Sequence, residues 1–156
     1  IAMYGLDPSD EWSPVFEIHP ALSMKSKVSR VRNLPPGAGI SYGRTAITEK
    51  PTRAALVPVG YGDGFHRILS NKGAVLIHGQ RAPILGRVCM DQFVVDVSGI
   101  PDVKQDDEVV IIGSQGDSSI RAEEIGRLAG TINYEVTTSL LPRVKRVYLR
   151  NHELIN

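Results

Sequence analysis

Three short stretches of the chain place side chains that can do chemistry next to a glycine or proline turn. The first is Ile40-Ser41-Tyr42-Gly43, which follows a turn rich in proline and glycine. A phenol acts as a general acid or base once its pKa falls from about 10 toward the working pH. A cation lowers that pKa if it lies close in space, and Arg44 is close in sequence. On spacing alone, an aromatic ring that fills a core or an interface is the commoner interpretation.

The second stretch runs from Val59 to Gly64 and reads VGYGDG. Alternating glycines do not continue a strand easily, so this pattern predicts a tight loop that presents Tyr61 and Asp63. It is not a phosphate-binding fingerprint, because no helical pattern follows it. A plain hairpin turn is the alternative interpretation.

The third stretch runs from Gly86 to Gln92 and reads GRVCMDQ. Its polar members, Arg87, Asp91 and Gln92, interrupt apolar strands and must be paired if they are buried. They mark either the wall of a site or a structural ion pair. Cys89 is predicted to be a small buried apolar residue rather than a nucleophile. With one cysteine and four histidines at no ligand spacing, we predict no metal site.

Composition narrows the class of protein. The chain has 156 residues, 42% hydrophobic and 22% charged, with a net charge of +1, which is typical of one soluble globular domain without a strong field for nucleic acid. No apolar run reaches the roughly 20 residues that cross a bilayer. The single cysteine excludes an internal disulfide and favours a reducing compartment, so we predict a cytoplasmic protein. Without an initiator Met or a signal peptide at Ile1, we expect the chain to start inside a longer protein.

The elements that must position these stretches are mostly short strands. Residues 1–20, which contain three prolines, predict an irregular linker, and residues 21–33 predict a strand with one solvated face and a bulge. Short β-branched segments separated by turn signals follow at 54–59, 74–77, 82–85, 93–97 and 109–112. Such spacing predicts a mainly β fold, a Greek-key-like β-barrel or sandwich.

One or two short helices complete the predicted fold. Ser119 is the expected N-cap of a helix over 120–129, whose apolar residues form one stripe. A second short helix is expected within 131–141, with Asn133 as its cap. Residues 143–149 alternate again and predict a closing strand.

Taken together, four segments in chain order resemble the alanine racemase family. They are IAMYGLDP, LSMKSKVSRVRNLPPGAGISYGRT, PVGYGDGFHRILSNKGAVLIHGQRAPILGRVCMDQFVVDV and TINYEVTTSLLPRV. The third segment is the most specific, and together they cover nearly the whole chain. The resemblance implies that residues 1–20 are the end of an N-terminal (β/α)-barrel and a linker, and that residues 21–156 are the C-terminal β-domain.

The resemblance also implies an activity and partners. Members of the family interconvert L-alanine and D-alanine with pyridoxal 5'-phosphate and supply D-alanine for peptidoglycan. They are head-to-tail homodimers in which the β-domain of one subunit covers the cofactor of the other. The lysine that carries the cofactor belongs to the barrel and has no counterpart in this sequence. We therefore expect this chain to be inactive without its own barrel domain and a second subunit.

Site residues carry over from the resemblance one by one. Tyr42 matches the tyrosine base that acts on the L-alanine face, opposite a lysine base. Met90 matches a residue that lines the substrate pocket, Tyr61 a tyrosine that narrows the substrate entrance, and Asp91 a neighbouring position of that wall. Asp63 is interpreted as a structural or entrance group, and so is Arg67.

Two positions match cofactor contacts. Tyr134 matches a tyrosine that reaches the cofactor phosphate, and Ile1 matches a residue whose backbone N–H contacts it. Tyrosine at the Tyr134 position accompanies a preference for alanine, whereas serine racemases of the family have asparagine there. A serine or broad-specificity racemase is the alternative, and so is a β-barrel module that has kept the motifs without the chemistry.

Overall fold

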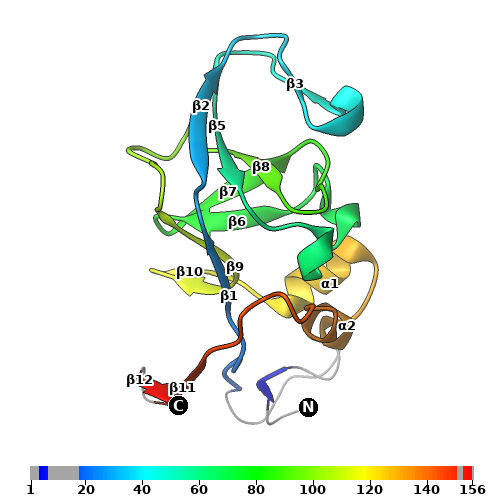
Figure 1. The fold of residues 1–156 in the computed structure, drawn as a ribbon, viewed down its shortest axis with the longest axis vertical. Coiled ribbons are helices and arrows are strands. Elements are labelled where there is room, and N and C mark those ends of the chain that lie inside the picture. The colour runs from blue at the N-terminus through cyan, green and yellow to red at the C-terminus, as the bar shows by residue number, and fades with distance from the viewer. Residues whose placement is uncertain (1–3, 7–17, 151–152, 156) are drawn as a thin grey trace.

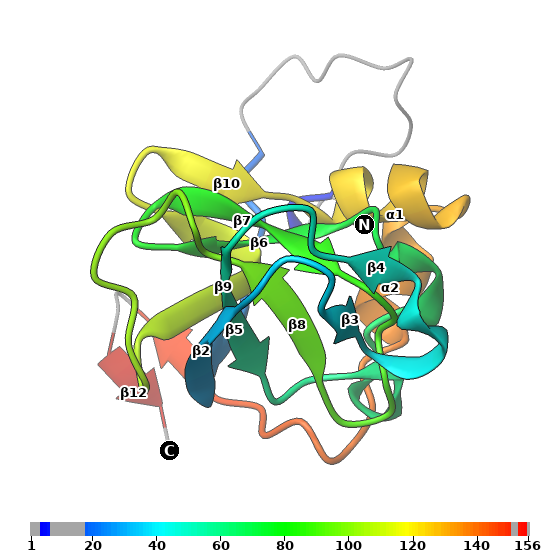
Figure 2. The same cartoon turned by 90° about the horizontal axis from the view of Figure 1, so that it is seen from above.

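The computed structural model describes residues 4–6, 18–150 and 153–155, and β-strands dominate them (Figures 1 and 2). The strands and helices are β1 (Met24–Lys27), β2 (Arg30–Leu34), β3 (Gly39–Ile40), β4 (Ala46–Ile47), β5 (Thr52–Val57), β6 (Ala74–Ile77), β7 (Gln80–Leu85), β8 (Phe93–Asp96), β9 (Glu108–Gln115), β10 (Ser118–Ile120), α1 (Ala122–Ala129), α2 (Asn133–Thr138), β11 (Tyr148–Arg150) and β12 (Glu153–Ile155). The predicted mainly β fold with two short helices is confirmed.

The main sheet is antiparallel and follows the order β1-β9-β6-β7-β8-β5-β2, with β10 paired to β9. Within it, β6, β7 and β8 are successive neighbours, and β9 returns to lie beside β6. This spatial order of four strands is that of a Greek key. Among the described residues no ladder joins β1 to β2, so the sheet is open rather than a closed barrel.

The strand predicted over 21–33 is two strands with different partners. At the point of change, the Val28 N–H donates to Asp107 O at 2.9 Å and the Ser29 N–H donates to Leu56 O at 2.8 Å. The chain thus changes its pairing partner from β9 to β5 without a turn. The alternation of apolar and polar residues within one segment does not reveal such a change. The expected bulge is present as a register shift between Met24 and Lys25.

A single apolar core lies beneath the sheet and extends to α1. Strand β9 buries Val109, Val110 and Ile111 completely, each with 0% exposure, although neighbouring residues point to opposite faces. Phe65 and Phe93 stack with ring centroids 5.0 Å apart. Phe65 directly follows the Val59–Gly64 stretch, and Phe93 directly follows the Gly86–Gln92 stretch. The core therefore holds the C-terminal end of each polar stretch in place.

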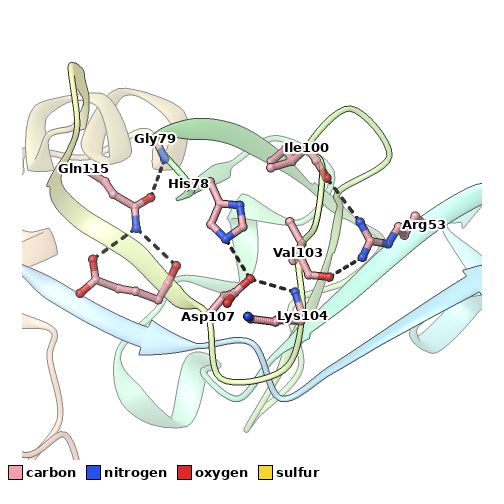
Figure 3. A network of polar contacts seen from close by, with 9 residues as sticks. Arg53, His78, Gly79, Ile100, Val103, Lys104, Asp107 and Gln115 are labelled. Atoms are coloured by element: carbon pink, nitrogen blue, oxygen red, sulfur yellow. Dashed lines mark hydrogen bonds and ion pairs between the residues drawn. The ribbon is translucent and has the colours of Figure 1, made fainter.

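The hairpin between β6 and β7 is pinned at its turn. His78 and Gly79 both have positive φ, 50° and 72°, which suits a two-residue hairpin turn. His78 Nε2–H donates to Asp107 Oδ2 at 2.8 Å, and the Lys104 N–H donates to the same oxygen at 2.8 Å (Figure 3). Gln115 Oε1 accepts the Gly79 N–H at 2.9 Å.

Both predicted helix caps are wrong. Arg121 is the N-cap of α1, because Ser119 pairs with Ser114 in the β9–β10 ladder and its backbone is committed to the strand. Ile132 is the N-cap of α2. Asn133 is buried within the helix, and its Nδ2 donates to Glu123 Oε1 at 2.9 Å, so this amide joins the two helices instead of capping one.

The closing strand expected over 143–149 is also wrong. Strand β11 begins only at Tyr148 and pairs with β12 in a separate hairpin, which lies at the opposite end of the long axis from β3 (Figure 1). Residues before it run irregularly, and Arg143 is used in ion pairs. No helix within the described ranges has the length and apolarity needed to span a membrane.

Candidate active site

Tyr42 lies at the tip of a short hairpin formed by β3 and β4 (Figures 1 and 2). The turn between the strands is tight, with φ of 58° at Ser41, 74° at Gly43 and 48° at Arg44. Such a turn leaves Tyr42 76% exposed, so this residue is not part of the core of the described chain. Non-glycine residues in the left-handed region are strained and gather at functional sites, which favours a functional role for this turn.

Thr48 fixes the base of the β3–β4 hairpin, a role the sequence interpretation missed. Its hydroxyl accepts the Ala38 N–H at 2.9 Å and donates to Pro35 O at 2.6 Å. Its carbonyl accepts the Gly37 N–H at 2.6 Å. With the side chain 7% exposed, Thr48 ties the hairpin to the preceding Pro-Pro-Gly turn and sets where Tyr42 projects.

Asn71 joins the tip of the hairpin to Gly86, the residue directly after β7. Asn71 Oδ1 accepts the Gly86 N–H at 2.6 Å, and Asn71 Nδ2 donates to Thr45 O at 3.3 Å. Gly86 has φ of 77°, and a Cβ there would lie 2.8 Å from Ile40 O. Only glycine lets β7 approach the backbone that immediately precedes Tyr42 so closely.

Two cations lie at the Tyr42 turn, Arg44 within it and Arg87 beside it. The Arg44 side chain folds over Gly39, where it fills the place of a Cβ. Arg87 is half-buried, and its Nε lies 3.5 Å from the position that a Cβ would take at Gly43. Arg87 does not line the hollow beside Tyr42, so its interpretation as part of a site wall stays a prediction.

A hollow of about 780 Å³ opens beside Tyr42. Four residues that the family resemblance assigned to the site line it together: Tyr42, Tyr61, Met90 and Asp91. Its remaining lining residues are Ser41, Cys89, Gln92, Phe93 and Val94. Three segments far apart in sequence thus converge on one open cavity, which is the arrangement expected of a binding site.

Two of these segments touch through their backbones. The Tyr61 N–H donates to Cys89 O at 3.0 Å, and the Gly62 N–H donates to Met90 O at 2.8 Å. A Cβ at Gly60 would overlap the carbonyl oxygens of Cys89 and Met90, so glycine is required there. The predicted tight loop is a 3-10 turn over Tyr61–Asp63, and its glycines serve close approach to the neighbouring wall.

Both acidic residues of these walls are paired with one cation. Arg143 Nε lies 2.7 Å from Asp63 Oδ1, and Arg143 Nη1 lies 2.8 Å from Asp91 Oδ1. The hydrogen bonds that Arg143 donates to Asp91, and next to Asp63, hold the pKa of its guanidinium above the ordinary value. Sequence reasoning did not assign Arg143, because its partners are far away in the chain.

The other expected site residues lie elsewhere. Cys89 is half-buried and lines the hollow, so the expectation of a fully buried residue is wrong. Tyr134 lies on α2, half-buried against the core and outside the lining of this hollow. Arg67 is exposed in the 3-10 turn Arg67–Leu69. Ile1 lies outside the described residues.

The hollow combines an exposed phenol with apolar and hydrogen-bonding walls. A phenol at the mouth of a cavity can give or take one proton from a bound molecule. No lysine of the described residues lines this hollow, so they offer no amine there for covalent attachment of a carbonyl compound.

Fold and site thus describe an antiparallel β-domain that presents a tyrosine over an open cavity. The family described as "Alanine racemase, C-terminal domain" matches residues 21–148. The chain belongs to this family. Alanine racemase of Halothermothrix orenii is 49% identical over 148 residues, which are 95% of this chain and 39% of that protein.

Solved structures agree with this assignment. The structure of alanine racemase from Bacillus anthracis with bound L-Ala-P is 42% identical and superposes with a TM-score of 0.94, covering 99% of this chain and 40% of that one. Alanine racemase of Clostridium difficile in complex with cycloserine gives 42% identity and a TM-score of 0.90, with 99% and 40% covered. The chain spans about two fifths of the length of these relatives.

Proposed function

We propose that this chain is the C-terminal domain of an enzyme that interconverts L-alanine and D-alanine, with Tyr42 as the acid–base group on the L-alanine face. The observation that carries the proposal is the convergence of Tyr42, Tyr61 and Met90 on one hollow in a domain of this family. In the full-length protein, the product D-alanine would serve peptidoglycan.

The chemistry assigned to Tyr42 is a single proton transfer. In one direction its phenolate oxygen takes the Cα proton of L-alanine, and in the other its O–H returns a proton to the same face. A second group on the opposite face must complete the inversion, and the resemblance gives that role to a lysine outside this chain. Ser41 and Gly43, both with positive φ, place Tyr42 at the tip of the hairpin, from which its side chain projects.

Pyridoxal 5'-phosphate is the cofactor that the family implies, and when bound it supplies an electron sink that makes the Cα–H of an amino acid acidic. The residues that line the hollow suit a position next to this cofactor rather than covalent attachment of it. They offer a phenol and apolar side chains, and no lysine is among the described lining residues. Tyr134, on α2, and Ile1 are proposed to contact its phosphate. Met90, Tyr61 and Asp91 are proposed to bound the substrate.

The proposed partners are the protein's own N-terminal barrel and a second subunit. The support is that the hollow stays open at about 780 Å³ with Tyr42 at 76% exposure, so a further surface is needed to enclose a small amino acid. Alanine is the preferred substrate because position 134 is a tyrosine, and serine is the second candidate.

Assay of the full-length gene product with pyridoxal phosphate tests this proposal. We expect racemisation of L-alanine with a kcat/KM at least about 10-fold above that for L-serine, since a pocket that fits a methyl group discriminates modestly against a hydroxyl. The 156-residue chain alone, with the same cofactor, is the control and is expected to be inactive. Equal rates on both substrates would favour a broad-specificity enzyme, and no racemisation of either would refute the proposal.

A further inference from the structure

Arg143 occupies a central place between two walls of the hollow. Its guanidinium meets Asp63 Oδ1 at 2.7 Å on the Tyr61 turn. On the facing segment it meets Asp91 Oδ1 at 2.8 Å and donates from Nη2 to Met90 O at 3.1 Å. One planar cation therefore binds three acceptors on two segments. In sequence, Asp63 and Met90 are 27 positions apart.

The surrounding backbone is built to admit this guanidinium. A Cβ at Gly62 would lie 2.5 Å from Arg143 Nη2, so any other residue would push the fork away from the turn. Asp63 Oδ2 also accepts the Gly60 N–H at 2.8 Å, and this bond orients the carboxylate that pairs with Arg143. The Leu141 N–H donates to Asp63 O at 3.1 Å and brings the segment after α2 against the same turn.

Exposed ion pairs contribute little to stability when each joins only two side chains. Arg143 differs because its fork geometry and its charge-assisted bonds fix orientation as well as distance. The two backbone hydrogen bonds between the walls, from Tyr61 and Gly62, do not involve it. Its loss is therefore expected to loosen the walls rather than to unfold the domain.

We propose that Arg143 is a positioning residue that fixes the Tyr61 turn and the Met90–Asp91 segment relative to each other and so sets how tightly the substrate amino acid is held. This inference rests on the proposed function. Tyr42 is held by separate contacts, through Asn71, Gly86 and Thr48. Arg143 thus acts on binding and leaves the proton transfer intact.

The test uses Arg143→Ala in the full-length protein, with Arg81→Ala as a matched control. Arg81 makes a bidentate ion pair with Glu124 at 2.6 and 2.7 Å, is similarly exposed (48% against 45%), and is not among the residues that line the hollow. We expect the KM for alanine to rise about 10-fold in Arg143→Ala while kcat changes less than about 2-fold. Arg81→Ala should leave both constants at the wild-type value.

Two further measurements separate positioning from charge and from stability. Arg143→Lys keeps the charge but reaches one carboxylate at a time, so it should restore the KM only in part, to within about 3-fold of wild type. Amide hydrogen exchange at Tyr61 and Gly62 should be at least about 5-fold faster in Arg143→Ala than in Arg81→Ala. Should Arg143→Ala not fold, Asp63→Asn removes one partner and is expected to change the KM in the same direction.

An unchanged KM in Arg143→Ala, or a fall of kcat at constant KM, would overturn the assignment. Full recovery by Arg143→Lys would also overturn it, because charge alone would then suffice. If the wild-type protein does not racemise alanine, the proposed function fails, and the exchange rates alone then decide whether Arg143 fixes the two walls.

Discussion

At the scale of single residues, the position of Tyr42 depends on glycines and small polar side chains rather than on its neighbours in sequence. Gly86 admits the close approach of the chain after β7 to Ile40, and Asn71 joins Gly86 to Thr45 by hydrogen bonds. The role of Thr48 is of the same kind. These residues do no chemistry, but their substitution should move the phenol.

The Gly86→Ala variant tests this dependence. A Cβ at Gly86 meets Ile40 O at 2.8 Å in a backbone with φ of 77°, so we expect a loss of about 2 kcal/mol in the free energy of unfolding and at least a 10-fold fall in kcat. Gly116→Ala is the control, because Gly116 has φ of 59° and open space around it. It should cost about 1 kcal/mol in urea unfolding and leave kcat unchanged. Equal effects of the two substitutions would contradict this account.

At the scale of elements, the sequence predicted most strands because short β-branched runs lie between turn residues. It located β6 within its observed bounds, Ala74–Ile77, and placed the Gly60–Gly64 turn. It could not predict the exchange of partners at Val28, because pairing depends on strands far away in the chain. Both helix caps failed for a related reason, since tertiary contacts use Ser119 and Asn133 elsewhere.

The residues that line the hollow could be predicted from the sequence, but the ion pairs that join its walls could not. Motif resemblance pointed to Tyr42, Tyr61, Met90 and Asp91, and the structure brings all four to one hollow. Nothing in the local sequence pointed to Arg143. Its importance arises only when the turn and the facing segment meet, because an arginine in an irregular stretch has no pattern of its own.

The contact between the β6–β7 turn and the β8–β9 connection predicts a pH dependence (Figure 3). The Lys104 backbone N–H, and next the His78 side chain, hold the pKa of Asp107 below its ordinary value of 3.8. Folding thus favours the ionised form of the Asp107 carboxyl group. Its contribution to stability is complete above the ordinary pKa and is lost as the pH falls through the lower pKa of the folded state.

The Asp107→Asn variant measures this contribution. At pH 7 we expect the free energy of unfolding to fall by about 1–2 kcal/mol, because the charge-assisted bonds are lost. The difference from wild type should shrink below about pH 4. Urea unfolding across this pH range gives both values, with Asp102→Asn in the same loop as the control. A difference that stays constant down to pH 2 would show that the Asp107 charge is not the cause.

At the scale of the whole molecule, the Greek-key sheet carries the site at one end and leaves it open. The tip of the β3–β4 hairpin, the Tyr61 turn and the Met90–Asp91 segment line one hollow. The chain spans about two fifths of the length of its relatives, and the lysine expected on the opposite face has no counterpart in it. We therefore propose that the domain forms one side of a shared site.

The central claim is that Tyr42 transfers the proton on the L-alanine face, and isotope exchange in the full-length protein tests it most directly. Tyr148→Phe is the control, since Tyr148 is 68% exposed and lies in β11 at the far end of the molecule. In D₂O, Tyr42→Phe should lose the exchange of the Cα proton of L-alanine by at least about 100-fold. Exchange of the D-alanine proton should stay within about 10-fold of wild type, because the opposite-face base is intact. Equal loss from both enantiomers, or wild-type exchange from L-alanine, would contradict the claim.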